Sequence, residues 1–173
     1  LLITQDPRLF DDFGYFSKHT ILDFPSWEIL PTEEIAPSPD IVGKRFEILY
    51  ALAKTKGPHI VTASLQAVLQ KTVSKKCLSA ECLVWNVGDE VPFASLPAKL
   101  TALGYRRNTV AADKGEFAVR GGIIDVFPLA STDPYRIDFF GDTIDQIRTY
   151  DPIGQKSIAK VKSLFLCPAQ ENG

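Results

Sequence analysis

The chain has 173 residues, of which 45% are hydrophobic and 23% charged, a composition typical of a globular protein that buries a core without disulfide or metal support. Its formal net charge is -2 and its pI is about 5.7, which excludes a bulk positive field that would attract nucleic acid. Any contact with nucleic acid would need a local patch or another part of a longer protein.

The cysteines, Cys77, Cys82 and Cys167, are odd in number. Cys77 and Cys82 have no second pair and no histidine nearby, so their spacing does not predict a zinc site. We therefore expect reduced thiols and a cytoplasmic location. No apolar run approaches the roughly 20 residues of a membrane span, and no signal peptide is recognised. Since the chain has no methionine, we interpret it as a piece of a longer protein.

The first part of the chain alternates strands and helices. Short apolar runs predict strands at 1–4, 21–24 and 59–63, and a proline-rich connection follows the second of them. Val42, Phe46 and Leu49 recur at helical spacing and predict a helix over 40–54. Ser64 is placed to cap a further helix. This order indicates an α/β unit with a parallel sheet, extending to about residue 75.

The pattern changes near Cys77, after which strands dominate. One short helix is expected to begin near Ser95 and Pro97, with Gly104 as its left-handed cap. Alternating segments at 116–119, 123–127, 135–140 and 143–150 are separated by glycine-containing turns, which are hairpin signals. The second part is therefore predicted to be a mainly antiparallel α+β unit.

Motifs that would indicate an enzyme are not found in the sequence. It contains no G-x-x-x-x-G-K-[ST] loop, no G-x-G-x-x-G after a strand and no nucleophile elbow. Four aspartates are spread over the predicted hairpins, and we expect them to lie on solvated faces and turns: Asp125, Asp138, Asp142 and Asp145. We predict no catalytic residues, cofactor or metal for this chain.

The stretch GEFAVRGGIIDVFP, residues 115–128, carries the strongest interaction signal. Arg120 adjoins two glycines, which let a partner backbone come close, and arginine is enriched at interface hot spots. Arg106, Arg107 and Arg136 are near in sequence, and Phe127 is a possible exposed aromatic, although either Val126 or Phe127 must face inward. The alternative is a surface arginine paired with Asp138 or Glu116.

Two stretches, GEFAVRGGIIDVFP and PYRIDFFGDTIDQIRTYDPIGQKSI, resemble the module shared by two bacterial nucleotide-excision-repair families, UvrB and the transcription-repair coupling factors. The segment FPSWEILPTEEIAPSPDIVGKRFEILYAL resembles the coupling factors, whose W-E-x-L-P motif it contains. UvrB carries a longer, tyrosine-rich insertion there, which this sequence lacks. The resemblance covers essentially the whole chain.

The resemblance implies an N-terminal fragment in three parts. Residues 1–75 would be an incomplete, degenerate RecA-like domain, 76–168 an inserted domain that binds UvrA, and 169–173 the start of the return segment. The fragment would recruit UvrA to stalled RNA polymerase without being an enzyme itself. The ATP- and Mg-dependent translocase motor and the contacts with RNA polymerase and double-stranded DNA would belong to other parts of the full-length protein.

The family's UvrA contacts carry over to four positions: Arg120, Arg106, Phe127 and Arg136. UvrB commonly has a further arginine where this chain has Ala118, so binding would depend more on Arg120. Two alternatives stay open at this point. One is a UvrB-like helicase or ATPase fragment that binds damaged DNA, which requires a phosphate loop before Leu1. The other is a nucleic-acid-binding module, against which the net charge argues.

Overall fold

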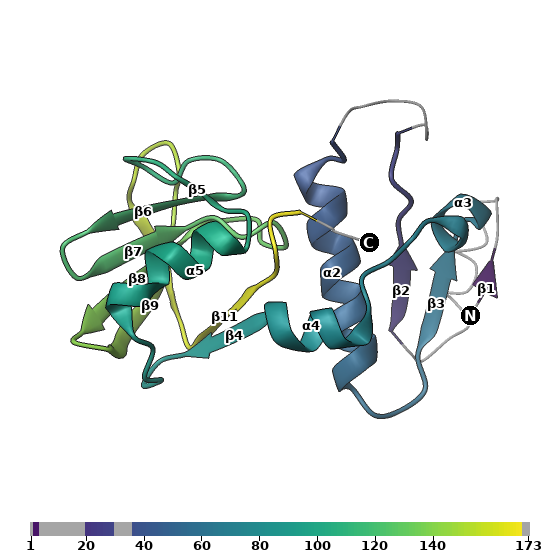
Figure 1. Cartoon of the computed structure of the whole chain (residues 1–173), viewed down its shortest axis with the longest axis horizontal. Helices are drawn as coiled ribbons and strands as arrows, with labels where there is room; N and C mark the ends of the chain where they lie inside the picture. The colour runs from purple at the N-terminus through teal and green to yellow at the C-terminus, as the bar shows by residue number, and fades with distance from the viewer. Residues whose placement is uncertain (1, 4–19, 30–35, 171–173) are drawn as a thin grey trace.

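The computed structural model describes residues 2–3, 20–29 and 36–170. Its first part contains β1 (Leu2–Ile3), β2 (Ile21–Phe24), α2 (Pro39–Lys54), β3 (Ile60–Ala63), α3 (Leu65–Leu69) and α4 (Lys75–Glu81). The strands form a parallel sheet in the order β1-β3-β2, with α2 connecting β2 to β3 (Figure 1). The predicted parallel sheet and the helix over 40–54 are thus confirmed, whereas the RecA-like assignment of this part stays a prediction.

Helix α4 is a structural element that the sequence pattern did not predict. Only Leu78 of its seven residues is buried, so it has no apolar periodicity to recognise. The signal it does carry is an N-cap, because Ser74 Oγ accepts a hydrogen bond from the Cys77 backbone N–H at 3.2 Å. Since α4 begins at Lys75, it lies across the predicted domain boundary, and that boundary remains a prediction.

The second part is built on an antiparallel sheet. Its elements are β4 (Leu83–Asn86), the short 3₁₀ helix η1 (Phe93–Ser95), α5 (Leu96–Ala102), β5 (Arg106–Arg107), β6 (Glu116–Arg120), β7 (Ile123–Val126), β8 (Tyr135–Phe140), β9 (Thr143–Tyr150), β10 (Ser157–Val161) and β11 (Ser163–Leu166). Strands β10-β9-β8-β7-β6-β5 form one sheet in that order, antiparallel except for the β5–β6 pair. The predicted mainly antiparallel unit is confirmed.

The expected helix and its cap are also confirmed. Helix α5 starts at Leu96 with a proline in its first turn, and Gly104 after it has φ +88°, the left-handed conformation that glycine adopts most readily. Leu96 and Leu100 are fully buried against one face of the six-stranded sheet, where they join Trp85, Ile124 and Ile137 in the largest hydrophobic cluster. This cluster is the core of the second part.

Helix α2 lies between the parallel sheet and the antiparallel unit (Figure 1). One side of α2 contributes Ile48 to a small cluster with Phe24 and Ala63 of the parallel sheet. Its other side contributes Val42 and Phe46 to a separate cluster. That cluster joins elements from both parts: Val42, Phe46, Val73, Leu78, Cys82, Leu129 and Cys167.

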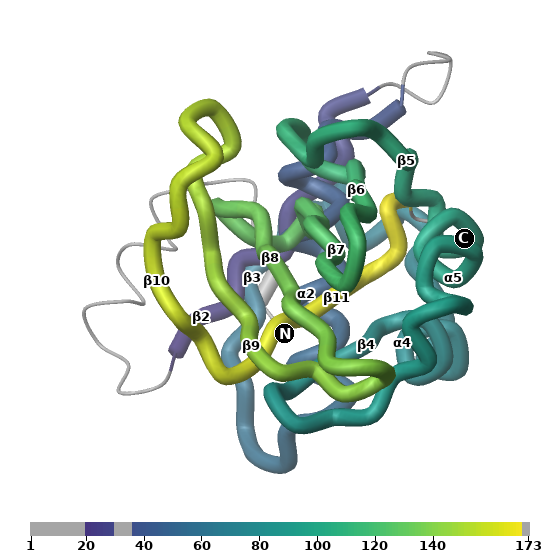
Figure 2. The backbone as a smooth tube through the Cα atoms, turned by 90° about the vertical axis from the view of Figure 1, so that its left-hand side faces the viewer, coloured from purple at the N-terminus to yellow at the C-terminus, as the bar shows by residue number. Residues whose placement is uncertain are grey.

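Strands β4 and β11 form an antiparallel two-stranded ribbon through which the chain enters and leaves the region of the six-stranded sheet. In Figure 2, turned by 90°, the strands of the large sheet lie in the foreground and α2 lies behind them. Among the residues described, no helix combines the length and apolarity needed to cross a bilayer. Residues 171–173 of the predicted return segment lie outside the described residues.

Candidate functional site

The two faces of the six-stranded sheet differ in chemistry. Because side chains alternate along a strand, Phe117, Ile124 and Ile137 point to the core under α5. The alternating residues point to the opposite face, here called the outer face. Its members on β6 to β9 are mostly polar: Glu116, Ala118, Arg120, Ile123, Asp125, Arg136, Asp138, Gln146, Arg148 and Tyr150.

A buried carboxylate organises the outer face. Asp125 on β7 is 1% exposed and lies opposite Arg136 on β8 in the strand register. Arg136 donates through Nε and Nη2 to the two oxygens of Asp125, each at 2.8 Å, and stacks on the Tyr150 ring with 4.5 Å from guanidinium carbon to ring centroid. Hydrogen bonding to Asp125 raises the pKa of Arg136 above its ordinary value. The bidentate pair therefore fixes β7 against β8.

Arg120 is the second partner of this carboxylate. Its Nη2 donates to Asp125 Oδ2 at 2.8 Å, while 52% of its side chain stays exposed. The alternative pairing of Arg120 with Asp138 or Glu116 is wrong, because Asp138 accepts from Arg148 at 2.8 Å and Glu116 pairs with Arg106. The guanidinium of Arg120 is therefore held in place by the buried Asp125 and is still accessible to solvent.

Arg106 lies on the edge strand β5, opposite Glu116 of β6. Its Nη2 is 3.7 Å from Glu116 Oε1, and 73% of its side chain is exposed. Glu116 also accepts from Asn108 Nδ2 and from the backbone N–H groups of Ala112 and Asp113, at 3.1–3.2 Å. The carboxylate therefore ties the β5–β6 connection to the sheet and leaves Arg106 at the surface.

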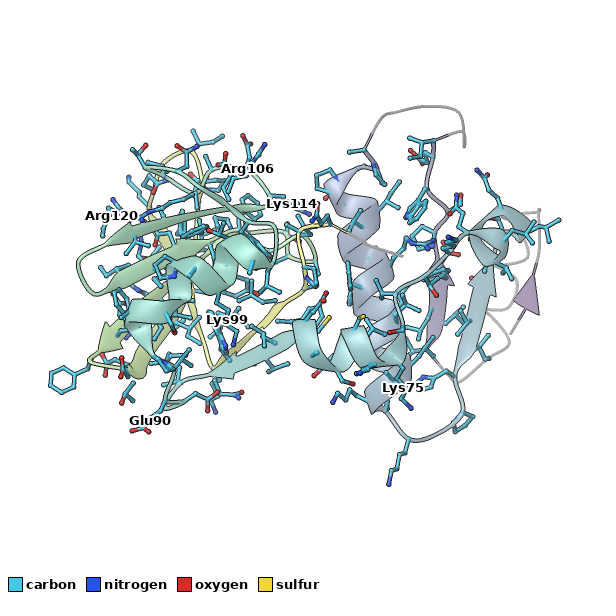
Figure 3. The ribbon with its side chains drawn as sticks, in the orientation of Figure 1. Lys75, Glu90, Lys99, Arg106, Lys114 and Arg120 are labelled. Carbon is cyan, nitrogen blue, oxygen red and sulfur yellow. The ribbon has the colours of Figure 1, made fainter. Side chains whose placement is uncertain are left out.

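The four predicted contact residues differ in how exposed their side chains are. Arg120 and Arg106 are accessible on the part of the molecule that contains the six-stranded sheet (Figure 3). Arg136 is only 13% exposed, and its guanidinium is engaged with Asp125 and Gln155. Phe127, which the sequence left as a possible exposed aromatic, is buried, since it is only 6% exposed. The assignment of these positions to a binding site stays a prediction.

The alternation argument, that either Val126 or Phe127 must face inward, holds for Val126, but Phe127 is buried as well because both sides of the strand end are covered. Val126 and Phe127 point to opposite faces, yet both are buried at 0% and 6% exposure. Backbone hydrogen bonds from Phe127 N–H to Glu116 O and from Gly115 N–H to Phe127 O continue the β6–β7 pairing past the end of β7, so Phe127 is held inside the pairing rather than in an open loop. Of the four predicted contact residues, Arg120 and Arg106 are therefore the ones whose side chains are accessible to a partner.

Sequence reasoning missed the role of Asp125, which was expected to be solvated. A usable signal existed, because Asp125 interrupts the apolar run IIDVF at the position that alternation assigns to the face of Arg120. Ala118 lies directly opposite Asp125 on β6 and is also buried. Its small side chain leaves room for two guanidinium groups around one carboxylate.

No group of three or more His, Cys, Asp or Glu side chains that could hold a metal ion occurs within the described ranges. The arrangement on the outer face is instead a set of surface cations anchored by buried acids. Such an arrangement can bind carboxylates of a partner through the guanidinium donors that remain exposed.

Comparisons with known proteins identify the family of the second part of the chain. The family described as the UvrB interaction domain matches residues 83–171, just over half of the sequence, and the chain belongs to this family. The match begins at β4 and runs past β11, so it contains the whole six-stranded sheet.

The similar proteins are transcription-repair-coupling factors. That of Escherichia coli (strain K12) is 32% identical over 164 residues, covering 95% of this chain, and that of Haemophilus influenzae is 34% identical over 175 residues, covering 99%. That of Mycobacterium tuberculosis is 37% identical over 172 residues, covering 93%. The chain spans only 14–15% of the length of these relatives. The resemblance predicted from the sequence is confirmed.

Proposed function

We propose that this chain is the UvrA-docking region of a transcription-repair-coupling factor. In the complete protein it would recruit UvrA to a stalled RNA polymerase during nucleotide excision repair. Two findings support the proposal. The chain belongs to the UvrB interaction domain family, and the relatives above carry the name of coupling factors over nearly the whole of its length. The named relatives are coupling factors, which favours this proposal over the helicase-like alternative.

The observation that carries the proposal is the anchoring of Arg120. Its guanidinium is held by the buried Asp125, yet half of the side chain remains exposed. A preorganised arginine loses less conformational freedom on binding than a freely rotating one, and arginines of this kind are enriched at hot spots. Arg106 adds a second exposed cation on the adjacent edge strand.

The remaining parts of the proposal concern the complete protein. We propose that the parallel sheet belongs to a degenerate RecA-like domain and that this chain needs no cofactor and catalyses no reaction. ATP and Mg would be used by a motor elsewhere in the protein, which would also contact RNA polymerase and double-stranded DNA. The location would be the cytoplasm.

The test is calorimetric titration of the chain against purified UvrA. The variant Arg120→Ala is expected to weaken binding about tenfold or more, since loss of a hot-spot residue costs about 2 kcal/mol. It should leave the fold intact, because Arg136 continues to neutralise Asp125. Lys99→Ala is the matched control, since Lys99 is an exposed cation on α5, the helix that covers the opposite face (Figure 3).

The outcomes separate the function from the site. Binding that is weakened equally by both variants, or by neither, would contradict the assignment to Arg120 while keeping the docking function. A folded chain that does not bind UvrA would contradict the proposal that this region is sufficient for docking. Binding that Arg120→Ala alone weakens would support both.

A further inference from the structure

The β4–β11 ribbon has two faces that pack into different clusters. Trp85 and Leu164, which face each other in the register, belong to the core under α5. The alternate position Phe165 packs against the cluster that contains Phe46 of α2. Cys82 and Cys167, which directly flank the ribbon, are members of that same cluster and are 5% and 0% exposed. Both cysteines therefore lie on the side of the ribbon that faces α2.

The strand register brings these two cysteines opposite each other. The last pair of the ladder is Leu83 with Leu166, and one further step in the same register pairs Cys82 with Cys167. One backbone group of each cysteine is hydrogen-bonded outside the ribbon. The Cys82 N–H donates to Leu78 O at 3.1 Å, and the Cys167 carbonyl accepts from the Tyr105 hydroxyl at 2.8 Å.

The type of pair determines how close the two side chains come. Val87 N–H donates to Lys162 O at 2.9 Å, so that pair is hydrogen-bonded, and hydrogen-bonded and non-hydrogen-bonded pairs alternate along an antiparallel ladder. Counting from Val87 and Lys162, the pair of Cys82 and Cys167 is of the non-hydrogen-bonded kind. Such pairs have Cα atoms about 4.5 Å apart, within the range of about 4.4–6.8 Å that disulfides require.

We propose that Cys82 and Cys167 are a latent disulfide pair, held reduced side by side, which a two-electron oxidant converts into a covalent link. In the reaction with an azodicarboxamide such as diamide, both S–H bonds break and one S–S bond forms. The two electrons and two protons pass to the N=N bond, which becomes a hydrazine. The link would join the strand that enters the antiparallel unit to the strand that leaves it, beside α2.

Both thiols are free and buried. Burial raises the pKa of Cys82 and of Cys167 to about 12, so both are protonated at neutral pH. Because the thiolate is the reactive species, oxidation is expected to be slow and to need an added oxidant. Cys77, by contrast, is partly exposed on α4.

The pairing is tested by oxidising the folded chain with diamide and digesting it with trypsin. The expected product links the peptide 77–99 to the peptide beginning at Ser163, with the loss of two hydrogens. Because the first peptide contains both Cys77 and Cys82, the variant Cys77→Ser assigns the link. It should form the link as the unaltered chain does, whereas Cys82→Ser and Cys167→Ser should not.

Two further measurements check that the variants are folded and that the disulfide forms in the folded chain. Circular dichroism checks that each variant is folded, and Cys82→Ala replaces Cys82→Ser if a buried hydroxyl unfolds the chain. The oxidised chain should melt about 10 °C higher than the reduced one, because the link closes a long loop, and dithiothreitol should abolish the shift. The proposal would be overturned by a link through Cys77, by a link that forms only in urea, or by two thiols that stay free in the folded chain.

Discussion

Asp125 is the residue on which the arrangement of the outer face depends. It accepts three hydrogen bonds of 2.8 Å from Arg120 and Arg136 while almost completely buried. A buried carboxylate without partners would be very unfavourable, and two arginines without it would repel each other. Asp125 therefore both holds the exposed Arg120 in place and links β7 to the neighbouring strands β6 and β8.

Replacing Asp125 with asparagine is therefore expected to be costly. Asp125→Asn keeps the shape but leaves two guanidinium groups without a counter-charge, so we expect the free energy of unfolding to fall by about 3 kcal/mol. Asp138→Asn is the control, because the Asp138–Arg148 pair is about one-quarter exposed on each side and should contribute about 0–1 kcal/mol. Urea unfolding of both variants measures the difference, and equal losses would contradict the central role of Asp125.

Glu116 makes a pH-dependent contribution to stability. Burial alone would raise the pKa of Glu116, but hydrogen bonds from Asp113, Asn108 and Ala112, together with Arg106, lower it below 4.5. A lowered pKa means that the folded state favours the ionised carboxylate, so the contribution is present above pH 4.5 and disappears as the pH falls through the folded-state pKa.

Comparing the unaltered chain with Glu116→Gln tests this pH dependence. The variant should be less stable at pH 7, and the difference in free energy of unfolding should shrink as the pH is lowered from 6 to about 3.5. Glu90→Gln, which removes an exposed carboxylate, controls for the loss of charge alone (Figure 3). A difference that stays constant or grows in acid would show that Glu116 does not act through its ionised form.

At the residue scale, the sequence pattern predicted the strands that carry Arg120 and Arg136, but the strand register of the structure was needed to place both side chains on one face of the sheet. The sequence also could not show which of the two arginines is accessible, because exposure depends on segments distant in sequence. Gln155, in the turn before β10, accepts a hydrogen bond from Arg136, and the residues of the β5–β6 connection surround Glu116. The burial of Phe127 was missed for the same reason.

At the scale of elements, the sequence predicted α2 within one residue but not what it contacts. Its spacing of Val42, Phe46 and Leu49 marks an apolar face without naming the partner. In the structure this helix packs against the segment after β7. A Cβ added at Gly43 would lie 2.3 Å from both the carbonyl carbon and the oxygen of Leu129. The absence of a side chain at Gly43 allows this close approach.

Gly43→Ala should therefore destabilise the protein even though alanine is the better helix former. The clash is with backbone atoms, which cannot rotate away, and overpacking of this kind costs about 1–3 kcal/mol, against about 1 kcal/mol gained from helix propensity. Because 2.3 Å is far inside van der Waals contact, we expect a cost at the upper end of this range and a net loss of about 2 kcal/mol in urea unfolding. Lys44→Ala, at the neighbouring exposed position of α2, should change stability by less than about 0.5 kcal/mol. A Gly43→Ala variant as stable as the unaltered chain would mean that α2 and the Leu129 segment can move apart freely.

At the scale of the whole molecule, the two parts are joined by shared packing. The cluster around Phe46 draws residues from α2, α4 and the segments that follow β7 and β11. Lys114, in the connection before β6, also pairs with Asp40 of α2 and donates to Leu129 O at 3.1 Å (Figure 3). These contacts link segments of very different sequence position, which periodicity along the chain cannot reveal.

Shared packing implies that the two parts unfold together. Phe46→Ala removes a side chain that is 1% exposed and should cost about 3–5 kcal/mol. Fluorescence is measured in a Trp27→Phe background, in which Trp85 is the remaining tryptophan. Trp85 lies in the core of the antiparallel unit under α5, not in the cluster around Phe46. If unfolding is cooperative, Phe46→Ala lowers the urea midpoint of Trp85 fluorescence as much as that of far-ultraviolet circular dichroism. A Trp85 transition that is unchanged while the dichroism transition shifts would show that the antiparallel unit folds independently of α2, and the proposed UvrA-docking surface would then tolerate damage to the first part of the chain.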